Sequence, residues 1–116
     1  MNVSATFPVT FEAALDKFIE AVKVIQFDYA NKHGFPVKDI GTTEGGRYIK
    51  VFKHDTVILL GVPTPHSASV YCFVDKTNGD ILKGSWKAPV KNGVRGNIFS
   101  ADVLDKVDQH GPKYLR

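Results

Sequence analysis

The chain has 116 residues, of which 43% are hydrophobic and 23% charged, and its formal net charge at pH 7 is +3. This composition is typical of one folded domain with its own core, and it excludes an intrinsically disordered chain. The single cysteine, Cys72, excludes an internal disulfide and fits a reducing cytosol. No apolar run reaches the roughly 18 residues that a membrane span needs, and the N-terminus lacks the order of a signal peptide. We therefore expect a single cytoplasmic domain over residues 1–116, with no membrane partner.

A helix is the clearest element in the sequence. Apolar residues recur at helical spacing from Phe11 to Lys32 and form one stripe. Thr10 is a good N-cap, and Gly34 is a typical C-terminal cap because glycine adopts the left-handed conformation readily. These signals predict an N-terminal amphipathic helix over residues 10–33.

The middle of the chain predicts an antiparallel sheet with a basic loop, over residues 46–99. Runs rich in β-branched and aromatic residues indicate four strands: Arg47–Lys53, Thr56–Val62, Ala68–Val74, and Ile81 to about Lys87. His54–Asp55 reads as a tight turn. Pro63–Ser67 reads as a rigid loop, because proline cannot donate a hydrogen bond to a strand ladder.

The C-terminal segment, residues 100–116, predicts a short helix and a tail. Ser100 is a suitable N-cap, apolar residues gather on one side of Ala101–Gln109, and Gly111–Pro112 is a stop signal. The fold class expected from the residues is thus α+β. The N-terminal helix packs on a strongly bent antiparallel sheet of four or five strands, with a short C-terminal helix.

The register of the hairpin at Asn78–Gly79 stays open between two alternatives. A two-residue loop puts the apolar residues of the preceding strand on the same face as Lys83 and Lys87. A three-residue loop with Gly79 in the left-handed region shifts the pairing by one residue. We favour the second alternative because it separates apolar from charged side chains. Its apolar face holds Val70, Cys72, Val74, Leu82 and Trp86, and its other face holds Tyr71, Phe73, Lys83 and Lys87.

The net positive charge comes from one segment, Ile81–Phe99, because acids and bases nearly cancel elsewhere in the chain. A glycine-rich basic loop of this kind favours contact with an anion, most plausibly with nucleic-acid phosphates. Its bases, which we expect to contact phosphates, are Lys83, Lys87, Lys91 and Arg95. Tyr71 and Phe73 are expected to stack on bases. Trp86 fits a core position better than a stacking position.

Nothing in the sequence indicates catalysis. The four histidines, His33, His54, His66 and His110, are scattered and do not have the ligand spacing of a zinc site. Ser67 lacks the context of a nucleophile elbow. We therefore expect a protein that is not an enzyme and holds no cofactor and no metal.

A resemblance to a known group of proteins rests on the segments Val74–Lys83, Trp86–Pro89, Arg95–Phe99 and the tail Gly111–Arg116. They resemble small uncharacterised proteins of marine tailed phages, cyanophages especially. At least one ocean-phage family of this size has an Sm-like fold, a helix followed by a small bent barrel that assembles into rings. The resemblance implies phage origin, the cytoplasm of an infected host cell, an α+β or small-barrel fold, a homo-oligomer and RNA involvement.

Two functional hypotheses follow. The leading one is an oligomeric, non-enzymatic phage accessory protein that binds nucleic acid, with RNA favoured over single-stranded DNA. The alternative is a protein–protein interaction module, a virion accessory or a host-directed protein, with no nucleic-acid ligand. It rests on Val24 and Phe27, which lie off the main helical stripe and can meet a loop or a neighbouring subunit. A small enzyme is a third, weaker hypothesis.

Overall fold

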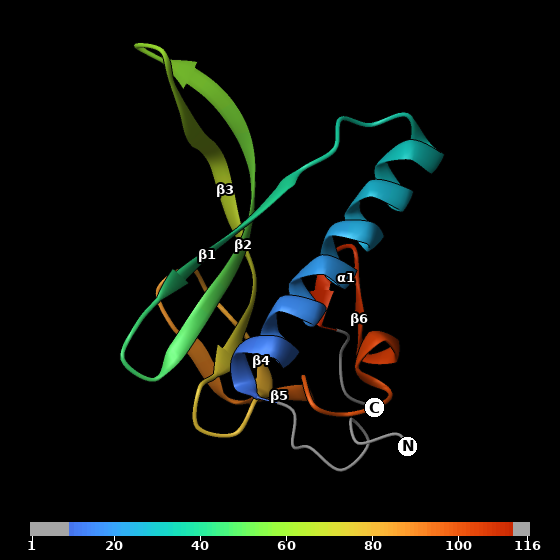
Figure 1. The fold of residues 1–116 in the computed structure, drawn as a ribbon, viewed down its shortest axis with the longest axis vertical. Coiled ribbons are helices and arrows are strands. Elements are labelled where there is room, and N and C mark those ends of the chain that lie inside the picture. The colour runs from blue at the N-terminus through green and yellow to red at the C-terminus, as the bar shows by residue number, and fades with distance from the viewer. Residues whose placement is uncertain (1–9, 113–116) are drawn as a thin grey trace, which may run out of the picture.

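One helix packs on one face of a five-stranded antiparallel sheet (Figure 1). This computed structural model describes residues 10–112, without the side chains of residues 91–93. It confirms the predicted α+β architecture with an N-terminal helix. The sheet has the order β1-β2-β3-β4-β5, so each strand pairs with the next. Its two edge strands, β1 and β5, do not pair with each other among the described residues, so this sheet is open.

The helix α1 (Phe11–His33) begins and ends where local signals predict. The hydroxyl of Thr10 accepts a hydrogen bond from the Ala13 amide at 3.1 Å. Gly34 adopts a φ of 72°, and the amide of the next residue, Phe35, donates to the Ala30 carbonyl at 2.9 Å. Both ends are therefore capped by their own sequence.

The strands β2 and β3 are longer than predicted, β4 ends earlier than predicted, and β1 precedes the predicted sheet. Their bounds are β1 (Asp39–Glu44), β2 (Tyr48–Leu59), β3 (Val62–Asp75), β4 (Asp80–Gly84) and β5 (Pro89–Asn97). The predicted turn at His54–Asp55 is wrong, because β2 runs through it. The predicted loop at Pro63–Ser67 is also wrong, because those residues belong to β3.

The chain reverses instead at Leu60–Gly61, a two-residue turn in which both residues have positive φ, 51° and 79°. Such a turn matches the twist of the strands that it joins. Pro63 and Pro65 lie opposite Ile58 and Thr56. Only β2 borders β3 there, and an edge strand tolerates proline where its nitrogen faces away from the neighbour.

The hairpin between β3 and β4 has neither of the two predicted registers. Phe73 pairs with Leu82 and Val74 pairs with Ile81, so residues 76–79 form a four-residue connection. Phe73 therefore shares a face with apolar Leu82 rather than with Lys83. The predicted face that combines Tyr71 and Phe73 with two lysines does not form.

The main core lies between α1 and the sheet. Phe18 and Val22 of the helix meet strand residues that are at most 3% exposed. These strand residues are Val51, Tyr71, Cys72, Val74 and Ile81. Burial raises the pKa of the Cys72 thiol, so this cysteine acts as a small apolar residue.

Residues 101–112 do not form the predicted helix. They form a 3₁₀ turn, η2 (Val103–Lys106), and a small two-stranded ladder of β6 (Val107–Asp108) and β7 (Gly111–Pro112). A nine-residue helix is marginal by itself. Here tertiary contacts hold an extended chain instead: the Tyr71 hydroxyl donates to the Asp108 carbonyl at 2.5 Å.

Candidate interaction surfaces

The predicted phosphate-binding residues are spread over two strands and a turn. Lys83 lies on β4, exposed Lys87 in the β4–β5 turn, and half-buried Arg95 on β5. The side chain of Lys91 is outside the described residues. Leu82 shares the face of Phe73, so alternation along β4 puts Lys83 on the opposite face. The three described bases therefore lie on three different elements, one of them on the face opposite Phe73, and contact of the four bases with phosphates stays a prediction.

Neither predicted stacking residue is accessible to a base. Tyr71 is 3% exposed, and its hydroxyl is engaged by the Asp108 carbonyl. Burial also raises the pKa of this phenol. Phe73 is 4% exposed and packs against the backbone of Gly84 and, edge-on, against the ring of Tyr48. Both rings are structural.

Trp86, expected in the core, instead lies on the surface and is 46% exposed. The Lys50 ammonium sits 3.8 Å from its ring centroid, and the Phe52 ring packs edge-on at 5.6 Å. We call Lys50, Phe52 and Trp86 the Trp86 cluster. Lys50 pairs with Phe73, and its neighbour Val51 faces the helix, so the cluster lies on the sheet face away from α1. Strand alternation along residues 48–52 is the signal that could have indicated this face.

A second surface is the hairpin that projects from the sheet at residues 55–66, which we call the arm (Figure 1). There β2 and β3 pair only with each other. Four aliphatic side chains at its end are more than half exposed, and we call them the arm tip: Ile58, Leu59, Leu60 and Val62. No charged residue occurs between Asp55 and His66. An exposed apolar group of this kind typically marks an interaction site.

The third surface is a groove between α1 and β1, with a volume of about 640 Å³. Val24 and Phe27 are 57% and 53% exposed and line it from the helix, while Val37 and Ile40 line it from the other side. Charged residues complete the lining of this α1–β1 groove: Glu20, Lys23, Lys38 and Asp39. Both residues that lie off the helical stripe thus contribute to an exposed apolar groove.

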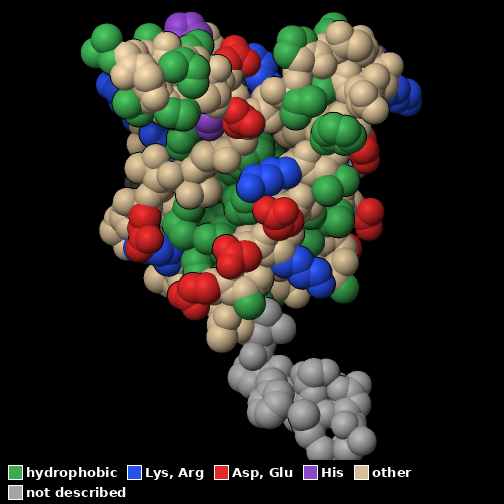
Figure 2. Space-filling view, turned by 45° about the horizontal axis from the view of Figure 1, so that its top comes forward, with side chains coloured by type: hydrophobic (Ala, Val, Ile, Leu, Met, Phe, Trp, Pro, Cys, Tyr) green, Lys and Arg blue, Asp and Glu red, His purple; other side chains and the backbone are tan. Residues whose placement is uncertain are grey.

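The arm and the C-terminal end of α1 stand apart on one side of the molecule (Figure 1). Figure 2 shows them as two lobes with a hollow between them, and hydrophobic side chains lie on both lobes. The described chain therefore presents apolar surface at two separate places on this side.

The comparisons with known proteins add a family. A model described as a family of unknown function, DUF7717, matches residues 8–115. The chain belongs to this family. No curated protein and no solved structure matches it.

Membership in DUF7717 assigns no activity, so the resemblance to marine phage proteins and to Sm-like folds stays a prediction. Within residues 10–112, no helix is both long enough and apolar enough to cross a membrane. The features of this member of DUF7717 that bear on function are its surfaces: the Trp86 cluster, the arm tip and the α1–β1 groove.

Proposed function

We propose that this protein is a non-enzymatic, self-associating interaction protein, whose arm tip docks in the α1–β1 groove of a second copy. The observation that carries the proposal is the arm tip, four aliphatic side chains that are each more than half exposed. Burying one such side chain stabilises a complex by about 1.5–3 kcal/mol. A group of four therefore favours association strongly.

The groove suits this occupant chemically. The stretch of residues 56–65 carries no charge, so the tip enters an apolar site without removing a charged group from water. Val24 and Phe27 supply the apolar wall, and charged residues such as Glu20 and Lys23 supply the polar part of the lining. An apolar centre with a polar rim is the usual anatomy of a protein interface.

The occupant must come from another molecule. His54 lines the groove, and the tip begins at Ile58, four residues further along the same strand and roughly 13 Å away at about 3.3 Å per residue. Because the arm is a paired hairpin, it cannot fold back onto its own groove. If each of two copies gives its arm to the other, a closed dimer results, and head-to-tail docking gives a ring or a filament.

The test measures molar mass in solution by sedimentation for the wild-type chain and for Leu60→Asp and Phe27→Asp. We expect the wild type to be oligomeric and each variant to be monomeric, because a carboxylate then enters an apolar contact. Val90→Asp is the matched control, since Val90 is 54% exposed and lies on β5, away from the arm and the groove.

Mixing the two variants tests the occupant directly. Leu60→Asp keeps an intact groove and Phe27→Asp keeps an intact arm, so a mixture should restore one interface and give a complex of the two. A monomeric wild-type chain, or a mixture that stays monomeric beside an oligomeric wild type, contradicts the proposal. Oligomers that survive in both variants contradict it as well.

A second candidate function, nucleic-acid binding, is favoured by the Trp86 cluster. A half-exposed tryptophan beside Lys50 and close in sequence to Lys87 combines a stacking surface with cations on an open sheet face. Trp86 is the only tryptophan in the chain, so its fluorescence reports directly on stacking.

Titration with single-stranded RNA at low salt should quench this fluorescence, and the affinity should fall as salt rises. Trp86→Phe should weaken binding less than Trp86→Ala, since stacking on one base is worth about 1–3 kcal/mol. Lys23→Ala, on the helix, is the matched control for Lys50→Ala. Unchanged fluorescence at low salt excludes this function for the cluster, whatever the oligomeric state.

A further inference from the structure

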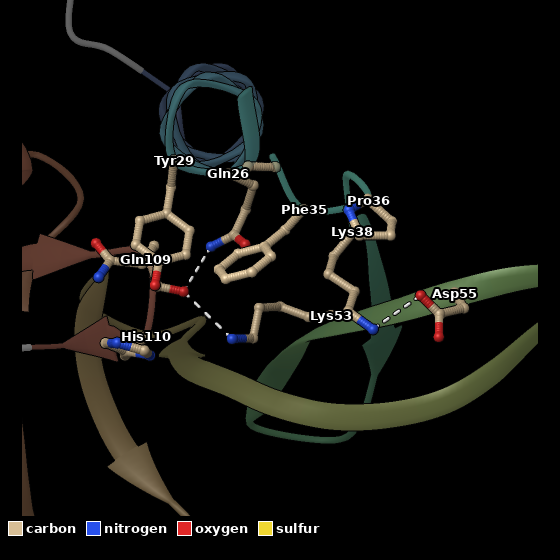
Figure 3. A pocket seen from close by; sticks show the side chains of 10 residues that line it. Gln26, Tyr29, Phe35, Pro36, Lys38, Lys53, Asp55, Gln109 and His110 are labelled. Carbon is tan, nitrogen blue, oxygen red and sulfur yellow. Dashed lines mark hydrogen bonds and ion pairs between the residues drawn. The ribbon is translucent and has the colours of Figure 1, made fainter. Parts of the chain in front are cut away.

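A cavity of about 350 Å³ lies between the C-terminal half of α1, the segment that leads to β1, strand β2 and the turn at Gln109–His110 (Figure 3). Its volume falls in the range of small-molecule sites. It is separate from the arm tip and the Trp86 cluster, none of whose residues lines it.

A cationic group points into this cavity. Lys53 is half-buried, and its ammonium donates to the Gln109 carbonyl at 3.2 Å. The Gln26 amide donates to the same carbonyl at 2.7 Å, so one oxygen accepts two bonds (Figure 3). Burial lowers the pKa of Lys53, and the charge of Lys38 lowers it further, against an opposite effect of Asp108.

One of the carboxylates near Lys53 is already engaged by another lysine. Asp55 accepts from the Lys38 ammonium at 2.8 Å. Within residues 10–112, Lys53 forms no ion pair, and an ammonium has three donors. A half-buried ammonium whose printed hydrogen bond goes to a neutral carbonyl keeps donor capacity for an anion, and a carboxylate in the cavity would be a stronger partner.

The remaining wall is aromatic. The Tyr29 ring centroid lies 6.1 Å from that of Phe35 and 6.1 Å from that of His110. In Figure 3 the side chains of Tyr29 and Phe35 extend from α1 and the following segment toward Lys53. These rings contact one another, so a flat apolar body would lie against their exposed side, with its charged end at the ammonium.

We propose that this cavity binds a small organic anion, a carboxylate on a flat unsaturated or aromatic body. The carboxylate accepts hydrogen bonds from the Lys53 ammonium, and the flat body lies against Tyr29 and Phe35. The site requires no second copy of the chain and shares only Lys38 with the lining of the α1–β1 groove, so different variants test benzoate binding and self-association.

The test uses sodium benzoate as the probe, with benzamide as its neutral counterpart and sodium acetate as a carboxylate without a ring. Binding is followed by NMR shifts of the Gln26 side-chain amide and of the Lys53 side chain in the full chain. We expect benzoate to bind at least about tenfold more tightly than benzamide, because the ammonium then donates to a neutral amide oxygen instead of to a charged carboxylate. Acetate should also bind more weakly than benzoate.

Lys53→Met keeps the apolar stem and removes the ammonium, so it should reduce benzoate affinity at least about tenfold. Lys17→Met, an exposed change on the helix outside the lining of the cavity and of the α1–β1 groove, is the matched control and should leave the affinity unchanged. If Lys53 only supports the Gln109 turn, Lys53→Met lowers the melting temperature and benzoate shifts neither signal of the wild type. That result overturns the proposal, as does equal binding of benzoate and benzamide.

Phe35→Ala is a second variant that does not depend on the lysine. Phe35 is 56% exposed, so the change should leave the fold intact, and it should weaken benzoate more than acetate. An equal effect on both probes contradicts the role given to the ring.

Discussion

The two halves of the β2–β3 hairpin both carry apolar side chains, but these side chains lie in opposite environments. Near the body, Val51 and Val74 are fully buried between α1 and neighbouring strands. At the far end, Ile58 and Leu59 are 65% and 56% exposed, although they are equally apolar. The difference is the number of neighbours: the body half has a helix on one face and a further strand on each side, β1 and β4, and the arm has neither.

Apolar composition therefore predicts that a strand is covered, but it does not predict whether a helix, a neighbouring strand or a second molecule covers it. An isolated two-stranded hairpin is marginally stable in water. Here the arm is a continuation of two strands that are anchored in the body. Folding stability and association should accordingly depend on different halves of the same hairpin.

The largest expected effect is in the body. Phe18→Ala removes a core ring that is 3% exposed and should lower the free energy of unfolding by about 3–5 kcal/mol. Leu60→Ala removes a fully exposed side chain, so unfolding of the dilute monomer should change by less than about 0.5 kcal/mol. Urea unfolding at low protein concentration measures both. A large loss for Leu60→Ala there would mean that the tip packs within its own chain.

Two glycines with positive φ, one in the body and one in the arm, should differ in how much an alanine substitution destabilises the fold. At Gly111, with a φ of 122°, a Cβ atom would lie 2.6 Å from the Tyr71 carbonyl oxygen. Gly111→Ala should therefore lower the free energy of unfolding by about 3 kcal/mol. At Gly61 in the arm, φ is 79° and nothing lies within 4 Å of that position. Gly61→Ala should lower it by about 1 kcal/mol. Equal losses in thermal unfolding would contradict this difference between body and arm.

The helix could be predicted because its signals are local. Thr10 and Gly34 lie at its ends and act within a few residues. The arm could not be predicted, since its turn places Leu60 in a left-handed conformation that leucine rarely adopts. Pro63 and Pro65 indicated a loop from the sequence alone. A strand accepts these prolines only if no other strand pairs with that side of β3, and this depends on the tertiary fold.

The predicted binding face depended on the register of the β3–β4 hairpin, and part of that register could have been predicted from the local sequence. Asp75 accepts hydrogen bonds from the Thr77 amide at 2.8 Å and the Thr77 hydroxyl at 2.6 Å, and Gly79 donates to the Asp75 carbonyl at 2.7 Å. These bonds fix the four-residue connection. An Asp-x-Thr pattern before Asn-Gly is a local turn signal, and it could have placed Phe73 with the apolar residues. The position of Trp86 against Lys50 and Phe52 is a contact between the β4–β5 turn and strand β2, which is distant in sequence, and no local pattern indicates it.

The third prediction concerns acid. Burial opposes ionisation of Asp75, but bonds from Thr77 and from Arg47 outweigh it, so its pKa is below the ordinary value. A lowered pKa in the folded state stabilises the fold above the ordinary pKa near 4 and loses that effect as pH falls through the folded pKa. Asp75→Asn should lower the free energy of unfolding at pH 7 by about 2 kcal/mol.

The matched change in the arm is Asp55→Asn, because Asp55 pairs with Lys38 at an exposed position and also has a lowered pKa. Its effect should be smaller, since water and salt screen an exposed pair. In urea unfolding from pH 7 down to pH 3, the free energies of unfolding of the wild type and of Asp75→Asn should approach each other as the pH falls. Curves that stay parallel over this range would assign the loss to packing rather than to charge.

The smallest expected effect has the opposite sign. Leu60 occupies the first position of its turn with a φ of 51°, and asparagine adopts this conformation more readily than leucine. Leu60→Asn should therefore raise the free energy of unfolding of the dilute monomer by about 0.5 kcal/mol, measured by urea unfolding. The same change should weaken self-association at least about tenfold, measured by sedimentation, because an apolar contact is lost.

These two signs distinguish the arm tip from an ordinary turn. A variant that merely damages the fold would lower stability and association together, whereas Leu60→Asn should move them apart. If it stabilises the monomer and leaves association unchanged, the tip is not the contact. If Leu60→Asn stabilises the monomer and weakens self-association, then Leu60 destabilises the isolated hairpin. Its contact with the groove of a second molecule then offsets that cost.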